Sequence, residues 1–558
     1  MSPNLRSRLR FVGTEGGALV LQTALGVIAL WHLVSTPRSW MLFDDGDSVL
    51  LAIVRRATEA GPPTEFGWSA VLFVPERLLY DVLSALTGLS PQATLALNAV
   101  VNLVLFGLAS RFLVAPALRA ASHTVRAMSG VVPVALLCAL VLTESSAARA
   151  SGELASLLML TTYYSATAWG VLVILGILVR LHRASTARRR VVTSAALIGV
   201  VGVSVWTNMI VLLWLVVPAT VVWCVFVVRP LWPALRRGRL PRGLVARALV
   251  VPGIVAVETA VVVVMRDTVT ASGYARAWDV SAGAALAAFA HALGDRFGSV
   301  EGALSVALWC VVWVASLVAA LRMLSAPRGR REDRTELALV AVSASAPLLC
   351  GIFVLGTLNL RYLQPVVFLP LAVAPVTLRV VGRAVRRRSS RSGVVARLPR
   401  TAACMSWVIG AAVVVTAVTA LPHVARASSA VPKDIACVVA WADATDRTGA
   451  GDFWAIRGVK YRLDDPGHLV QLSERLVADG SLIDKRESAG VHEVSWVVVG
   501  PGAPAGTPEY AGDASPGLPL SAYVRAAGGV EPQRTQTCGR LLIADWGSPV
   551  VRIGGTRR

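Results

Sequence analysis

Long apolar stretches, separated by short polar segments, occupy most of residues 1–421. An apolar helix of about 20 residues crosses the hydrocarbon core of a bilayer, and eleven of these stretches are long enough to do so. The predicted spans cover residues 17–34, 93–114, 130–147, 163–181, 191–207, 209–228, 248–266, 301–321, 337–356, 361–380 and 401–421. Since 55% of all residues are hydrophobic and only 16% are charged, the pattern predicts an α-helical polytopic membrane protein.

The pattern changes in residues 422–558, where Gly, Pro and Asp become frequent and no stretch is long enough to span. Short apolar or alternating runs at 436–444 ("ACVVAWADA"), 492–500 ("HEVSWVVVG") and 540–546 ("RLLIADW") predict strands. The apolar spacing within 465–482 predicts a helix that ends at Gly480. We therefore expect a transmembrane domain over 1–421 and a small soluble α/β domain over 422–558.

Positive charge is concentrated in the segments between apolar stretches and brings the formal net charge to +21. If the N-terminus is cytoplasmic, the arginine-rich segments all fall on the cytoplasmic side, as the positive-inside rule requires. We therefore expect a multi-pass protein of the plasma membrane whose loop 35–92 and C-terminal domain are extracytoplasmic. No aromatic residues alternate with these arginines, so nucleic acid is not an expected partner.

Two of the seven cysteines, Cys437 and Cys538, lie in the predicted soluble domain, while the other five fall within spans. In an oxidising compartment these two could form a disulfide, although two unpaired buried thiols remain an alternative. No C-x-x-C or H-E-x-x-H spacing occurs, which argues against a zinc site.

Three carboxylates, Asp44, Asp45 and Asp47, follow the first predicted span within "FDDGDS". They could cap the next helix and mark the water boundary. Alternatively, at the mouth of a cavity they could act as a general base, and Asp45 and Asp47 could hold Mg²⁺ or Mn²⁺, which prefer carboxylate oxygens. Position alone does not decide between these interpretations.

Two further segments offer candidate substrate-binding residues. The semi-apolar stretch 61–90 contains Trp68 and Glu76 and is too charged to span, so we expect it to lie along the membrane interface and cover a cavity. In "NLRYLQPVVFLP" (359–370), Arg361 and Tyr362 open a late span on the same side as the aspartates. Arg361 could bind a phosphate, or it could anchor the helix end at the headgroups with Tyr362 in the aromatic belt.

The acidic motif after the first span, the interfacial loop, the R-Y-x-x-P pattern and the number of spans together resemble the GT-C superfamily of polytopic glycosyltransferases. This resemblance implies an inverting enzyme that takes a sugar from a polyprenyl-phosphate donor, and membrane lipid is a further expected partner. The acceptor would be an envelope glycan, lipid or protein at the outer face. One departure is the sequence Asp-Asp-Gly-Asp, where many members have Asp-Glu or Glu-Asp, which leaves open which carboxylate is the base.

A non-enzymatic transporter, flippase or envelope scaffold is the alternative function. Glu258, placed at mid-depth of a predicted span, is the residue that would favour a proton-coupled transporter. Glu144, at the end of the third predicted span, and Glu153, in the loop after it, could line a cavity, but we expect both to be solvated loop residues.

Overall fold

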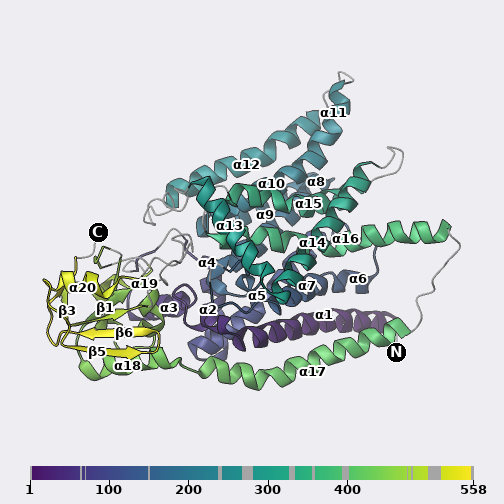
Figure 1. The fold of residues 1–558 in the computed structure, drawn as a ribbon. Coiled ribbons are helices and arrows are strands. Elements are labelled where there is room, and N and C mark those ends of the chain that lie inside the picture. Colours follow the sequence, from purple (N-terminus) through teal and green to yellow (C-terminus); the bar gives the residue numbers. More distant parts are fainter. Residues whose placement is uncertain are drawn as a thin grey trace.

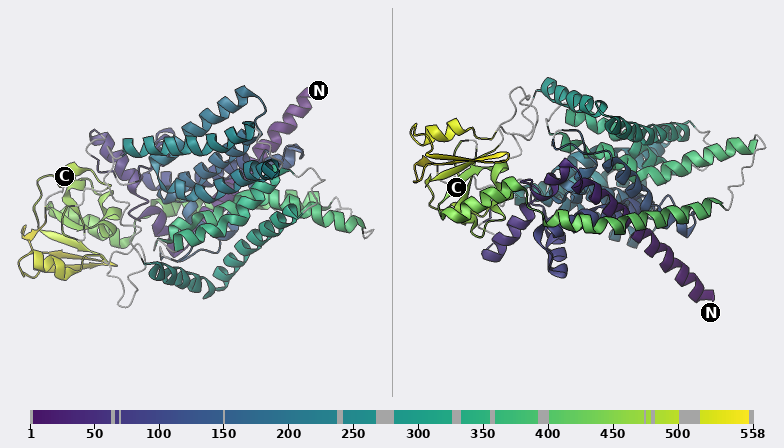
Figure 2. Two further views of the ribbon diagram at one scale, coloured as in Figure 1. Left: turned by 90° about the horizontal axis from the view of Figure 1, so that it is seen from above. Right: turned by 60° about the horizontal axis from the view of Figure 1, so that its bottom comes forward.

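The computed structural model describes residues 3–62, 66–68, 71–148, 151–236, 242–266, 281–325, 333–354, 359–391, 401–473, 475–478, 482–500 and 517–554. Long helices lie roughly side by side in a bundle, and a small α/β domain sits at one end of it (Figure 1). The chain starts near the opposite end of the bundle from this domain (Figures 1 and 2). This is the expected fold class, a helical membrane region followed by a small mixed domain.

Within the described ranges, nine helices are long and apolar enough to cross a membrane. They cover Phe11–Val34, Pro91–Val114, His123–Val141, Thr161–Arg183, Ala187–Thr207, Ile210–Trp232, Val300–Leu324, Leu360–Arg386 and Val408–Thr445. The other two predicted spans coincide with helices α12 (Arg242–Arg266) and α15 (Arg334–Val354). The polytopic prediction is thereby confirmed, and each predicted span falls on a helix.

Helix α1 (Pro3–Val34) packs against α5 (Pro91–Val114), α7 (Val131–Val141) and α17 (Thr401–Ser429). Helix α16 (Gln364–Arg391) packs against α5, α7, α14 (Val300–Leu324) and α15. The remaining long helices are α8 (Ala166–Arg183), α9 (Ala187–Thr207) and α10 (Ile210–Trp223). Shorter helices are α2 (Trp40–Phe43), α3 (Leu50–Ala60), α4 (Val74–Thr87), α6 (His123–Met128), α11 (Arg229–Arg236) and α13 (Ala282–Phe297).

The described part of the C-terminal domain is built on a five-stranded sheet of order β2-β1-β4-β6-β5. Strands β2, β1 and β4 are parallel, whereas β6 is antiparallel to both β4 and β5. A separate antiparallel pair joins β3 and β7. The strands are β1 (Gly449–Asp452), β2 (Leu469–Leu472), β3 (Glu493–Val494), β4 (Trp496–Val499), β5 (Arg534–Cys538), β6 (Leu541–Asp545) and β7 (Val551–Arg552).

Helices cover both faces of this sheet. Apolar residues of α18 (Lys433–Thr445) and α19 (Phe453–Lys460) form one core with alternate strand residues, among them Trp496 and Ile543. Tyr523 of α20 (Leu520–Ala526) forms the other core with Ala450 and Val497. This is the alternation expected of strands that are buried on both faces.

Two local predictions in this domain are wrong. Segment 436–444, expected as a strand, lies within helix α18, and its alanines are good helix formers. Segment 465–482, expected as a helix, contains strand β2, whose residues are all buried beside β1. The predicted helix end at Gly480 lies outside the described residues. The other two predicted strand segments contain β3, β4 and β6. Cys437 of α18 and Cys538 of β5 form a disulfide with a Cα–Cα distance of 5.7 Å.

Candidate active site

The three aspartates of the acidic motif, residues 44–47, have different partners. The Asp44 carboxylate pairs with Arg462 of the C-terminal domain at 2.6 Å. Asp45 is fully buried and accepts a hydrogen bond from the Tyr163 hydroxyl. Asp47 pairs with Arg361 at 2.8 Å, and both side chains stay partly exposed, at 13% and 17%. The motif therefore links two segments of the bundle and the C-terminal domain.

Arg361 lies in the short 3-10 turn Leu360–Leu363 that leads into α16. Its guanidinium carbon is 5.7 Å from the ring centre of Tyr163, 5.5 Å from that of Tyr164 and 6.0 Å from that of Tyr362. Aromatic faces attract a cation within about 6 Å, so the rings and Asp47 together hold the guanidinium in place. Arg361 and Tyr362 therefore lie beside the acidic motif.

Tyr163 and Tyr164 are site residues that the sequence reasoning missed. They precede α8 in the turn Thr161–Ser165, where Tyr164 adopts a left-handed conformation with φ of 67°. Such a backbone is costly for a bulky residue and persists only where its surroundings enforce it. Gln364 supplies part of that support by donating to the Tyr163 carbonyl at 2.9 Å. The polar run "TTYYS", next to a long apolar stretch, was the available signal.

Glu76 is buried in the first turn of α4, with 2% of its surface exposed. Burial raises the pKa of its carboxyl group to about 8, and backbone N–H groups of Glu76 and Ala166 only partly offset this effect. Ala166 comes two residues after Tyr164, so Glu76 supports the same turn. The Trp68 ring centre lies 4.9 Å from that of Phe66 and 5.8 Å from the Arg77 guanidinium carbon.

Two close glycine contacts fix the acidic motif against α19 of the C-terminal domain. A Cβ at Gly458 would lie 2.8 Å from the Asp44 carbonyl oxygen, and a Cβ at Gly46 would lie 2.9 Å from the Phe453 ring. Both distances are too short for a side chain, so only glycine allows this approach. Burial raises the pKa of the Asp44 carboxyl group even though Arg462 acts in the opposite direction.

Asp45 and Asp47, the two aspartates expected to hold Mg²⁺ or Mn²⁺, each have a protein partner. In the part of the chain that the structure describes, no group of three or more His, Cys, Asp or Glu side chains is arranged to hold a metal ion. The Asp47 carboxylate is paired with a guanidinium and the Asp45 carboxylate is bonded to a phenol.

Glu144 and Glu153 are not the solvated loop residues that we expected. Glu153 is 5% exposed and pairs with Arg38 at 3.1 Å and with Arg296 at 2.9 Å. Glu144 is 3% exposed and accepts from the backbone N–H groups of Ala155 and Ser156. They are buried structural groups that hold the second loop.

Glu258 of α12 faces Gly202 of α9, with its carboxylate 2.7 Å from where a Cβ of Gly202 would stand.

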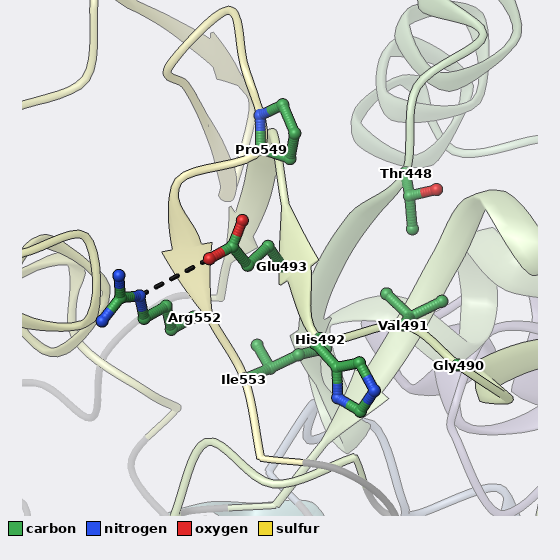
Figure 3. A pocket seen from close by; sticks show the side chains of 8 residues that line it. All are labelled: Thr448, Gly490, Val491, His492, Glu493, Pro549, Arg552 and Ile553. Atoms are coloured by element: carbon green, nitrogen blue, oxygen red, sulfur yellow. Dashed lines mark ion pairs between the residues drawn. The ribbon is translucent and has the colours of Figure 1, made fainter.

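A pocket of about 590 Å³ lies on the C-terminal domain, at the edge where Thr448 precedes β1 (Figure 3). Glu493 and Arg552 line it and form an ion pair of 3.5 Å between two well-exposed side chains. No residue of the acidic motif lines it, and neither does Arg361. We therefore assign it no part in the candidate site.

No family model matches the chain, and no curated protein matches it. Among solved structures, it is similar to the crystal structure of ArnT from Cupriavidus metallidurans bound to undecaprenyl phosphate. The similarity covers 95% of this chain and 98% of that one, with a TM-score of 0.45 and 14% identity. At this identity, neither site residues nor a ligand can be transferred from that protein to this chain.

Proposed function

We propose that the chain is an inverting membrane glycosyltransferase, which moves a sugar from a polyprenyl-phosphate donor to an envelope acceptor at the outer face of the membrane. The observation that carries the proposal is the ion pair between Asp47 and Arg361. It joins a carboxylate that can accept a proton to a guanidinium that can bind a phosphate. Asp47 follows α2 and precedes α3, and these two helices lie next to the soluble domain (Figure 1).

Arg361 is the proposed phosphate-binding group. A guanidinium offers donors in a planar fork that matches phosphate oxygens, and the surrounding tyrosines keep this one in a fixed position. When the donor phosphate pairs with the Arg361 guanidinium, the Asp47 carboxylate loses its ion-pair partner and becomes a stronger base. The residual exposure of both side chains allows a substrate to reach them.

Asp47 is the proposed general base. It accepts the proton of the acceptor hydroxyl while the hydroxyl oxygen forms a bond to the anomeric carbon of the sugar. The bond from that carbon to the phosphate oxygen breaks, and its electron pair leaves with the polyprenyl phosphate, whose charge Arg361 stabilises. Asp45, which is buried under Tyr163, and Asp44, which is held by Arg462, position the motif instead of reacting.

Substitution of Asp47 and Arg361 tests the assignment. Membranes that contain Asp47→Asn or Arg361→Met should transfer labelled sugar from a panel of polyprenyl-phosphate sugars to envelope acceptors at least about 100-fold more slowly than wild type. Arg361→Lys should recover only part of the rate, because a lysine cannot form the bidentate contact. Protein abundance should stay unchanged.

Matched controls are Glu59→Gln and Arg55→Met, which disrupt an exposed ion pair on α3. Both should transfer at the wild-type rate. Full transfer by a variant with Asn at all three positions 44, 45 and 47 would refute the proposal and favour a transporter or scaffold. The proposed mechanism contains no metal step, and the rate of transfer in excess EDTA tests whether Mg²⁺ or Mn²⁺ takes part at Asp45 and Asp47.

A further inference from the structure

The carboxyl ends of the parallel strands β1 and β4 lie at one edge of the sheet in the C-terminal domain. Between these two strands the order of the strands in the sheet changes direction. Strand β2 lies on one side of β1 and β4 lies on the other, so the chain leaves β1 in one direction and returns to its opposite side. In open α/β sheets this is where ligands bind. The pocket of Figure 3 lies at the other end of β1, near Thr448.

Asp452, the last residue of β1, has one oxygen occupied and one unsatisfied. Its Oδ1 accepts from the backbone N–H groups of Trp454 and Ala455 and so caps α19. Its Oδ2 has no hydrogen-bond partner among the described residues, and it is buried, since the whole residue is only 8% exposed. Positions that a Cβ of Gly517 and of Gly500 would take lie 3.0 and 3.5 Å from this oxygen. A buried carboxylate oxygen without a partner is costly, and a ligand would remove that cost.

A second buried polar group without a partner lies on the same side of the sheet. The hydroxyl of Tyr523 in α20 is fully buried and has no hydrogen-bond partner in the described part of the chain. Burial, and in addition the negative charge of Asp452, raise the pKa of the Tyr523 hydroxyl. Alternation along β1 puts both groups on one side of the sheet, because Asp452 shares the sheet face of Ala450 and Ala450 packs in the same core as Tyr523.

We infer that Asp452 and Tyr523 bind hydroxyl groups of a neutral saccharide, and that this saccharide is part of the acceptor. The carboxylate oxygen of Asp452 accepts hydrogen bonds, and the phenol of Tyr523 can both donate and accept them. Together they fit neighbouring hydroxyl groups of a sugar. A phosphate is disfavoured because the carboxylate already caps α19 and would repel it. A metal ion lacks ligands here, since the described residues include no cluster of three His, Cys, Asp or Glu side chains fit to hold one.

The position next to the acidic motif identifies the saccharide as acceptor, and this step rests on the proposed function. Phe453 and Trp454, directly after Asp452, approach Gly46, with ring atoms 2.9 and 3.3 Å from where its Cβ would stand. Helix α19 thus carries the saccharide site at its first turn and contacts the acidic motif along its length, up to Gly458. A glycan held at Asp452 would approach the membrane domain beside Asp47.

The test uses the full-length protein in nanodiscs and a panel of neutral methyl glycosides of hexoses and pentoses. Saturation-transfer NMR and titration should show saturable binding of at least one neutral glycoside to the wild type. Methyl glucuronide, which is charged, should not bind. Asp452→Asn, which keeps the helix cap, and Tyr523→Phe should each weaken the affinity at least about tenfold. Asp443→Asn, an exposed position in α18, should bind as the wild type does.

Stability of the unliganded protein separates a binding site from a structural pair. If Tyr523 is free for a ligand, Tyr523→Phe should keep or raise the thermal midpoint without glycoside. The inference is overturned if no glycoside binds saturably, or if both variants bind as the wild type does. Binding of undecaprenyl phosphate, measured in parallel, should fall in Arg361→Met and not in Asp452→Asn. If Arg361→Met binds undecaprenyl phosphate as well as the wild type does, the proposed function is contradicted. The glycoside measurements test the saccharide site separately.

Discussion

Asp44, Asp45 and Asp47 are close neighbours in sequence, but their surroundings assign them different tasks. Asp44 pairs with an arginine of the C-terminal domain, Asp45 is sealed under a tyrosine, and Asp47 stays partly exposed beside Arg361. The sequence predicted that an acidic motif and a late arginine carry the chemistry. It could not rank the three carboxylates, because their partners come from residues more than a hundred positions away.

Glu153 is the anion of a buried ion cluster, and its loss should be costly. Glu153→Gln leaves the guanidinium groups of Arg38 and Arg296 without their shared carboxylate. We expect the free energy of unfolding, measured by denaturant titration in detergent, to fall by about 3–5 kcal/mol. Glu59→Gln, whose ion pair is exposed, should change it by less than about 1 kcal/mol. Equal effects of the two substitutions would contradict this account.

Glu76 should make stability depend on pH. Its folded pKa of about 8 lies above the ordinary value of 4.5, so between these values the folded protein keeps a proton that the unfolded chain releases. Stability is therefore highest below pH 4.5 and falls as pH rises toward 8. Glu76→Gln should remove this slope and raise the free energy of unfolding at pH 8 by about 4 kcal/mol. Parallel pH profiles for wild type and variant would argue against a buried, protonated Glu76.

At the scale of elements, hydrophobic length predicted the bundle well because a membrane span needs a long apolar helix whatever its neighbours are. The C-terminal domain was harder, because short apolar runs do not distinguish strand from helix. Residues 436–444 form α18 and residues 469–472 form β2, the reverse of the prediction, since sheet pairing and packing decide such segments. The turn at Tyr163 and Tyr164 was missed for a related reason: tertiary contacts impose its left-handed backbone.

Helix α19 should act as the support of the acidic motif. Gly458→Ala would place a Cβ 2.8 Å from the Asp44 carbonyl oxygen, so the helix and the motif must separate. We expect sugar transfer to fall about tenfold to a hundredfold, because displacement of a catalytic group by about 1 Å is that costly. Gly199→Ala in α9, where nothing lies within 4 Å of the added Cβ, is the matched control and should leave transfer intact. Unimpaired transfer by Gly458→Ala would remove α19 from the catalytic account.

At the scale of the whole molecule, loop and domain contacts join the two parts into one site. Arg56 of α3 donates to the carbonyls of Lys460 and Leu463, and Arg486 donates to those of Ala57 and Ala60. These reciprocal arginine contacts flank the pair of Asp44 with Arg462. Because α3 follows the acidic motif directly, the C-terminal domain and the motif must occupy the same side of the membrane.

That side is expected to be the outer one, and cysteine labelling can check it. Asp443→Cys lies on an exposed position of α18, whereas Arg189→Cys lies at the exposed, arginine-rich start of α9. In intact cells a membrane-impermeant maleimide should label the first variant and leave the second unlabelled until the membrane is permeabilised. The parent protein supplies the background, since Cys437 and Cys538 are bonded to each other and its other cysteines fall within predicted spans. Labelling of Arg189→Cys from outside would invert the topology, and the proposed reaction would then face the cytoplasm, away from envelope acceptors.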